Sequence, residues 1–123
     1  MMQKDNRTIA FVCTGNTCRS PMAEAIFNDM AEKNGVCVRA ESFGIATSTG
    51  LPVSENSVIA CKEIGIDLSG KASTAVADAG IEKYEKFYCM SQSHAKMLTQ
   101  FFLVQPEKIA VLGISDPYGG DIE

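Results

Sequence analysis

The sequence is poor in the residues on which several common kinds of site depend. It contains one histidine, His94, and its five cysteines include no Cys-x-x-Cys pair, which excludes the usual structural zinc sites. Mechanisms that activate a cysteine or serine with a histidine are excluded for the first half of the chain, unless the fold brings His94 close. We therefore expect no metal and no other cofactor.

Basic residues and long apolar runs are also scarce. The 11 lysines and arginines are outnumbered by 15 acidic residues, and the net charge of -4 argues against general binding to nucleic acid or anionic membranes. No apolar run approaches the roughly 20 residues of a membrane-spanning helix, and the first residues lack the apolar stretch of a secretion signal. We expect a cytoplasmic protein that binds neither nucleic acid nor membranes, with its five cysteines reduced.

What is present is the composition of one compact domain spanning residues 1–123. Its 46% apolar residues can supply one closed core. The apolar patterns predict strands at 8–12, 36–43, 86–90 and 108–112, which alternate with helices at about 21–33, 55–64 and 93–102 and a weaker helix at 75–84. Ser20 and Pro21 are typical of the N-cap and first residue of the first helix. The alternation predicts an α/β fold, a three-layer sandwich with a four-stranded parallel sheet and helices on both faces.

The segment from Cys13 to Ser20 joins the first strand to the first helix. In α/β folds ligands bind beyond the carboxyl ends of the strands, and the N–H groups of such a loop form a concave site for phosphate. Arg19, six residues after Cys13, can hold two phosphate oxygens with its planar guanidinium. The donors that bind phosphate also stabilise a thiolate, so Cys13 can attack phosphorus without a neighbouring base.

The remaining residues of this segment support the same hypothesis. The Ser20 hydroxyl can donate to the sulfur, and the Asn16 side chain can brace the loop. The alternative is that Cys13 is only a buried residue at a strand end, because free cysteines are among the most buried residue types. The residues predicted to surround the substrate in this loop are Thr14, Gly15, Asn16, Thr17, Cys18 and Ser20.

A second motif, Asp116-Pro117-Tyr118-Gly119, follows the last predicted strand. Hydrolysis through a phosphocysteine needs an acid for the leaving atom and then a base for water, and one carboxyl group can serve as both. Asp116 is the candidate for this acid and base, and Asp121 is a weaker candidate because it lies farther from the strand end. Tyr118 can form a wall of the substrate slot. The alternative is a structural turn, since Asp-Pro-x-Gly is common turn chemistry.

Together the two motifs resemble the low-molecular-weight protein tyrosine phosphatase family, whose signature is a Cys-x5-Arg-Ser loop near the N-terminus and a late Asp-Pro-Tyr or Asp-Pro-Phe segment. The similarity runs from Ile9 to Gly120 and includes a Ser-x-Gly turn at 42–44. It implies a phosphocysteine intermediate with Cys13 as nucleophile, Arg19 as phosphate ligand and Asp116 as acid and base. The substrates would be phosphorylated proteins or peptides, with phosphate or other oxyanions as product or inhibitor.

Cys18 matches a second loop cysteine of many members of the family. In those members it can form a reversible disulfide with the nucleophile under oxidation, and a thiolate beside such a resolving thiol suits redox regulation. The alternative for Cys18 is a small residue facing the core.

Thr17 bears on the choice of substrate. The loop Cys-Thr-Gly-Asn-Thr-Cys-Arg, followed later by Asp-Pro-aromatic-Gly-Gly, is similar to the branch that contains bacterial protein-arginine phosphatases. There a threonine at this position is associated with phosphoarginine, whereas tyrosine phosphatases tend to carry an aliphatic residue. Both substrates stay open, and the loop slightly favours phosphoarginine.

The resemblance also implies a final helix after the Asp-Pro segment. This sequence ends at Glu123, so we expect the domain to lack that helix and one face of the sheet to be partly uncovered.

Two alternative functions are also compatible with the sequence. A thioredoxin-coupled arsenate reductase uses a similar loop but passes oxidation to two further cysteines about seven residues apart, whereas Cys61 and Cys89 are widely separated. Those reductases also usually carry a glutamine where Pro21 stands. A non-hydrolytic phosphocysteine carrier or anion-binding protein is the second alternative, which Arg19 and Asp116 disfavour.

Overall fold

The computed structural model describes residues 7–112, which form a four-stranded parallel sheet flanked by helices. The strands lie in the order β2-β1-β3-β4, with bounds β1 Arg7–Cys13, β2 Val38–Gly44, β3 Lys86–Cys89 and β4 Ile109–Val111. The helices are α1 Arg19–Lys33, α2 Glu55–Glu63 and α3 Gln92–Phe101. The predicted four-stranded α/β fold is confirmed.

Strand β1 is central because its residues are apolar on both faces of the sheet. It pairs with β2 along its whole length, up to Cys13 opposite Gly44, and with β3 up to Val12 opposite Cys89. Ala10 and Val12 contribute to one core cluster, whereas Ile9, Phe11 and Cys13 contribute to another. This division follows from the period of two in a strand, which sends successive side chains to opposite faces.

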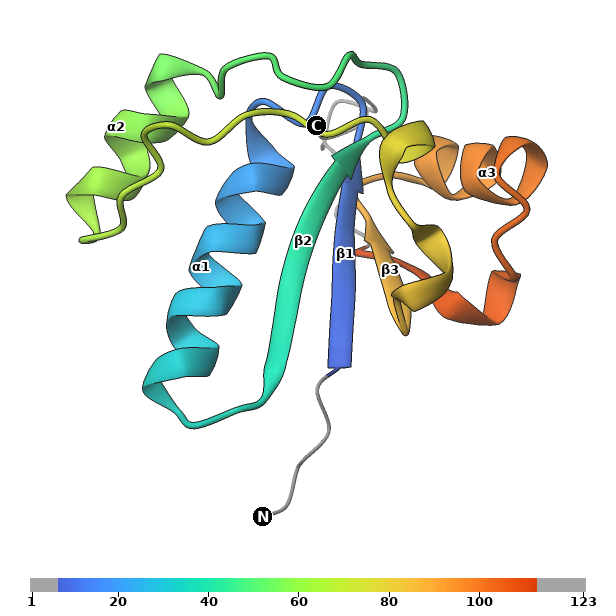
Figure 1. Ribbon diagram of the computed structural model, residues 1–123, viewed down its shortest axis with the longest axis horizontal. Helices are drawn as coiled ribbons and strands as arrows, with labels where there is room; N and C mark the ends of the chain where they lie inside the picture. The colour runs from blue at the N-terminus through green and yellow to red at the C-terminus, as the bar shows by residue number, and fades with distance from the viewer. Residues whose placement is uncertain (1–6, 113–123) are drawn as a thin grey trace.

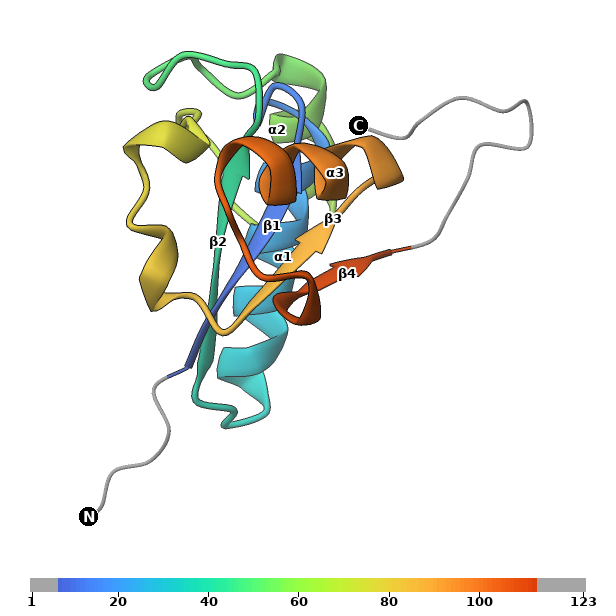
Figure 2. The same ribbon diagram turned by 90° about the vertical axis from the view of Figure 1, so that its right-hand side faces the viewer.

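The two core clusters correspond to the two helical layers. Helix α1 covers one face of the sheet, with α2 beyond its start, and α3 covers the other face (Figures 1 and 2). The cluster on the α3 face includes Phe87 and Leu98, and that on the α1 face receives Phe27. None of the helices within residues 7–112 combines the length and apolar character needed to cross a membrane.

Two predictions about helices were wrong. Helix α1 begins at Arg19 with Cys18 as its N-cap residue, so Ser20 lies inside the first turn and is not the cap. Its hydroxyl is turned to the cysteine loop instead. The weak helix predicted at 75–84 is two 3₁₀ turns, Val76–Asp78 and Ile81–Lys83, separated by the helix-disfavouring Gly80.

Helix α2 ends and begins where its capping residues predict. The Ser54 hydroxyl accepts a hydrogen bond from the Ser57 N–H, which is the usual contact of an N-cap serine. Gly65 follows the helix at φ +81°, a left-handed conformation that glycine adopts without strain. The predicted helix ends at Ile64 and the observed one at Glu63, so they differ by one residue.

The order of the strands creates a topological switch point beside the cysteine loop. The connection from β1 leads to β2 on one side of β1, whereas β3 and β4 lie on the other side. The direction of the chain across the sheet therefore reverses between β1 and β3. In parallel sheets ligands bind at such a switch point, beyond the carboxyl ends of the strands. The segment after β1 and the start of α3 after β3 both meet there.

Candidate active site

The cysteine loop, residues 13–20, turns sharply between β1 and α1. Cys13 is the last residue of β1 and is 2% exposed. Asn16 adopts the left-handed conformation at φ +57°, which asparagine tolerates better than most residues because its short side chain can hydrogen-bond locally. The backbone N–H of Asn16 consequently points back to the Cys13 sulfur, at 3.1 Å.

The sulfur of Cys13 has two polar neighbours despite its burial. Besides the Asn16 N–H, the Ser20 hydroxyl lies 2.7 Å from it. A backbone N–H and a hydroxyl are donors that stabilise negative charge on sulfur, as a nucleophilic cysteine requires. The interpretation of Cys13 as only an inert strand-end residue does not account for these two contacts.

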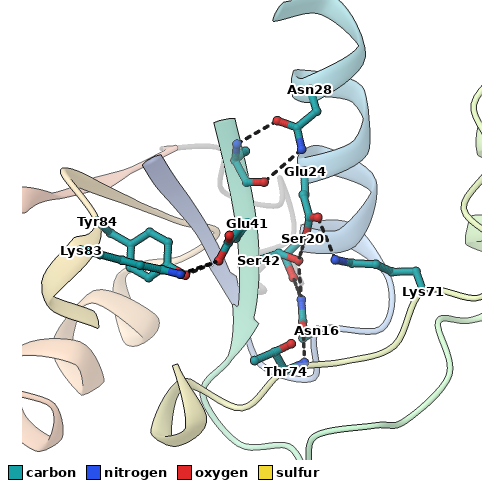
Figure 3. Close-up of polar contacts among 11 residues, drawn as sticks. Asn16, Ser20, Glu24, Asn28, Glu41, Ser42, Lys71, Thr74, Lys83 and Tyr84 are labelled. Carbon is teal, nitrogen blue, oxygen red and sulfur yellow. Dashed lines mark hydrogen bonds and ion pairs between the residues drawn. The ribbon is translucent and has the colours of Figure 1, made fainter. Parts of the chain in front are cut away.

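The Asn16 side chain joins three parts of the chain under the loop. Its amide NH₂ donates to Ser20 Oγ at 2.8 Å and to Ser42 Oγ at 2.9 Å, and its carbonyl oxygen accepts from the Thr74 N–H at 2.6 Å (Figure 3). Asn16 is only 1% exposed, so these bonds replace the water that a buried amide loses. The prediction that Asn16 braces the loop agrees with this geometry.

The network continues to an ion pair that the sequence did not indicate. The Ser42 hydroxyl donates to Glu24 Oε1 at 2.6 Å, and Lys71 Nζ lies 2.7 Å from Glu24 Oε2 (Figure 3). The side chain of Glu24 is 14% exposed and that of Lys71 is 32% exposed, so the pair is partly shielded from solvent. Lys71 comes from the loop after α2, and no local pattern connects it with Glu24 on α1.

The segment after β2 packs against the cysteine loop. Ile45 N donates to the Cys13 carbonyl at 2.9 Å, and Ala46 N donates to the Thr14 carbonyl at 3.0 Å. A Cβ on Gly44 would lie 2.8 Å from the Thr14 carbonyl oxygen, closer than real Cβ contacts allow. Glycine is therefore needed for this close approach of two backbones.

His94 also lies beside the loop, although 80 residues separate it from Thr14. Its Nε2 is 2.9 Å from the Thr14 hydroxyl and its Nδ1 is 3.2 Å from the Ser91 hydroxyl. The fold thus brings the histidine to the loop, where its ring contacts the Thr14 hydroxyl. Sequence reasoning could identify His94 only as the single histidine, because no local pattern connects it with Thr14.

The other predicted loop residues differ in exposure. Thr14, Gly15 and Thr17 are half-buried, whereas Cys18 and Arg19 are exposed. The exposure of Cys18 contradicts the alternative that it faces the core. The Thr17 carbonyl accepts from the Ser54 N–H at 2.7 Å, which ties the loop to the start of α2.

Part of the predicted site falls beyond the described chain. Three predicted residues lie outside residues 7–112, namely Asp116, Tyr118 and Asp121. The expected absence of a final helix also concerns positions outside this range. Among the described residues, no three His, Cys, Asp or Glu side chains gather where they can hold a metal ion.

The comparisons with known proteins agree on one kind of protein. A family model described as low molecular weight phosphotyrosine protein phosphatase matches residues 8–123. The protein-arginine-phosphatase of Bacillus subtilis (strain 168) is 33% identical over 124 residues, which cover 94% of this chain and 82% of that protein. The low molecular weight phosphotyrosine protein phosphatase of Saccharomyces cerevisiae is 30% identical over 142 residues, which cover 99% of this chain and 86% of that protein.

A solved structure gives the same result in three dimensions. A mutant of the arginine phosphatase YwlE, with a phosphorylated active-site serine, superimposes with a TM-score of 0.81 at 32% sequence identity. The match covers 93% of this chain and 80% of the other.

Proposed function

Because the chain belongs to the low molecular weight phosphotyrosine protein phosphatase family, we propose that it hydrolyses phosphorylated protein side chains through a phosphocysteine intermediate on Cys13. The observation that carries this proposal is the environment of the Cys13 sulfur, which contacts the Asn16 N–H and the Ser20 hydroxyl. The phosphorylated active-site serine in the YwlE mutant further supports a covalent phosphoenzyme.

The reaction has two steps that use the same residues. The Cys13 thiolate attacks phosphorus, the bond to the leaving oxygen or nitrogen breaks, and Asp116 gives that atom a proton. Water then attacks the phosphocysteine and passes its proton to Asp116, which releases phosphate and the thiolate. Arg19, at the start of α1, binds two phosphate oxygens, and the Ser20 hydroxyl stabilises the leaving sulfur.

Phosphoarginine is the substrate side chain that we favour over phosphotyrosine. The Thr17 hydroxyl in the loop can orient a guanidinium group or a water, and the backbone of Thr17 is held by Ser54. The name of the Bacillus subtilis relative supports this choice, whereas the yeast relative supports phosphotyrosine. Tyr118 would form a wall of the substrate slot, and phosphate and related oxyanions would inhibit as product analogues.

The reducing cytoplasm is the compartment in which this chemistry fits best. All five cysteines are free thiols in the structure. Cys18 is exposed in the same loop as Cys13, so a two-electron oxidant such as a peroxide would join the two sulfurs in a disulfide, which thiols would reduce again, and this cycle would give redox regulation.

The arsenate reductase alternative has less support. Cys61 and Cys89, the cysteines that would carry the disulfide, are buried in different core clusters. Burial raises the pKa of both thiols, for Cys89 to about 12, which makes them poor nucleophiles near neutral pH.

The alternative of a phosphocysteine carrier is tested by counting turnovers. A carrier that does not hydrolyse the phosphocysteine would release a single equivalent of leaving group for each protein molecule.

One experiment tests both the mechanism and the substrate. The parent, Cys13→Ser and Thr17→Ile are assayed with phosphoarginine and phosphotyrosine peptides of the same sequence, and Thr99→Ile on α3 serves as a matched control. We expect Cys13→Ser to bind inorganic phosphate without turnover, and Thr17→Ile to shift preference toward phosphotyrosine. Turnover by Cys13→Ser would exclude the intermediate, and an unchanged preference in Thr17→Ile would exclude the proposed role of Thr17.

A further inference from the structure

The cysteine loop is held by polar contacts from two sides of β1. On the β2 side, Ile45, Ala46 and Ser54 donate backbone hydrogen bonds to loop carbonyls, and Ser42 and Thr74 bond the Asn16 side chain. On the β3 side, the side-chain contact found within residues 7–112 comes from His94 in α3, which reaches Thr14. Thr14 is the first residue after β1 and directly follows Cys13.

The His94 ring is well placed to act as a rigid support. It is 4% exposed, and both of its ring nitrogens have hydroxyl partners, Thr14 at 2.9 Å and Ser91 at 3.2 Å. Ser91 is itself buried and is the N-cap residue of α3, and its hydroxyl lies 2.8 Å from that of Ser93. Rotation of the ring would break both contacts, so the position of Thr14 is tied to the start of α3.

The contact also affects what the Thr14 hydroxyl can do. A threonine hydroxyl has one hydrogen and can accept as well as donate. A neutral His94 ring with its hydrogen on Nε2 donates to Thr14, while the Ser91 hydroxyl donates to Nδ1. The hydrogen of Thr14 is then available to an oxyanion in the loop.

We propose that His94 is a positioning residue for this site: it holds the Thr14 hydroxyl, and thereby the first turn of the cysteine loop, in the arrangement that binds the phosphoryl group. The proposal rests on the proposed phosphatase function for its kinetic consequences, but its effect on oxyanion binding can be measured without turnover. His94 acts through Thr14 and does not take part in the proton transfers.

The kinetic test compares His94→Ala, His94→Gln, Thr14→Val and the double variant His94→Ala/Thr14→Val, with Gln92→Ala in the same helix as the control. Loss of one such hydrogen bond is expected to lower kcat/KM for p-nitrophenyl phosphate about tenfold and to weaken inhibition by inorganic phosphate similarly. Gln can present an amide N–H to Thr14, so His94→Gln should recover most of the loss. The double variant should be no worse than the poorer single variant.

Three results would overturn the proposal. His94→Ala could lower Tm while kcat/KM and phosphate inhibition stay at the parent values, which is the behaviour of a purely structural histidine. His94→Gln could be as impaired as His94→Ala. The effects of His94→Ala and Thr14→Val could also multiply in the double variant, which would show that the two residues act independently.

A spectroscopic test uses the fact that His94 is the only histidine in the chain. The ring ¹⁵N resonances of the parent are followed by NMR as inorganic phosphate is added. We expect them to shift at saturation in the parent and to shift much less in Thr14→Val at saturating phosphate. If the parent binds phosphate but hydrolyses no phosphoester, the proposed function fails while this test still decides the role of His94. Ring ¹⁵N resonances that do not shift when phosphate binds would refute that role.

Discussion

Asn16 is the residue on which the shape of the cysteine loop depends. Its backbone places an N–H on the Cys13 sulfur, and its side chain bonds three other segments from a buried position. A left-handed backbone and a buried amide are both costly unless the surroundings hold them. Glu24 and Lys71 extend the same network to the outside of the molecule.

The two contributions of Asn16 can be separated with Asn16→Ala and Asn16→Gly. Both variants lose the side-chain bonds, which we expect to lower the free energy of unfolding by about 2–4 kcal/mol. Only Ala adds the strain of a left-handed backbone, so Asn16→Gly should be more stable by about 1 kcal/mol. Urea unfolding measures the difference; equal stability of the two variants would show that the positive φ is not maintained.

At the scale of elements, the loop is supported by the way β2 and α1 fit together. The Asn28 side chain on α1 bonds both backbone groups of Ala40 on β2, at 3.0 and 2.8 Å (Figure 3). This contact fixes the distance between helix and strand on the edge of the sheet. The end of β2 at Gly44 can then lie directly against the carbonyl of Thr14.

Gly44→Ala tests this close approach, with Gly80→Ala as a matched control. The new methyl group of Gly44→Ala would meet backbone at 2.8 Å, so we expect a loss of about 1–3 kcal/mol in stability and a lower kcat/KM. Gly80 has negative φ and nothing within 4 Å of an added Cβ, so its replacement should change little. Tm and kcat/KM are measured for both variants. A Gly44→Ala variant with the Tm and kcat/KM of the parent would contradict the predicted clash with the Thr14 carbonyl oxygen.

At the scale of the whole molecule, the core on the α3 face contains two groups that are neutral at physiological pH. Burial raises the pKa of the Cys89 thiol to about 12, from an ordinary value of 9.0. Burial, and then the hydrogen bond donated to Glu41, raise the pKa of the Tyr84 hydroxyl. Both groups resist ionisation because their charged forms would lie in the folded core.

These pKa values predict a loss of stability in alkali. The unfolded chain gives up the Cys89 proton near pH 9, whereas the folded chain retains it until about pH 12. The stabilisation is therefore complete below about pH 9 and falls as the pH rises, by at most about 1.4 kcal/mol per pH unit for each group. Urea unfolding from pH 8 to 10.5 should show this decline, and it should be shallower in Cys89→Ala; an equal slope in both proteins would contradict it.

The sequence by itself determined the elements and the cysteine loop, and the tertiary structure decided which residues support that loop. The strands, the α1 stop after Lys33 and the Ser54 cap depend on neighbouring residues, so their patterns are visible in the chain. The Ser20 cap and the helix at 75–84 were predicted wrongly because a hydrogen-bond partner from the loop and a break at Gly80 outweighed local preference.

The contacts of Asn16 with Thr74, of Glu24 with Lys71 and of Thr14 with His94 join residues 47 to 80 positions apart. The contacts of Asn16 and Thr14 exist because β1 lies between β2 and β3, and the order of strands in a sheet is set by the packing of the whole chain. The local sequence therefore indicated a cysteine prepared to accept a phosphoryl group, and only the folded sheet showed which side chains hold it in place.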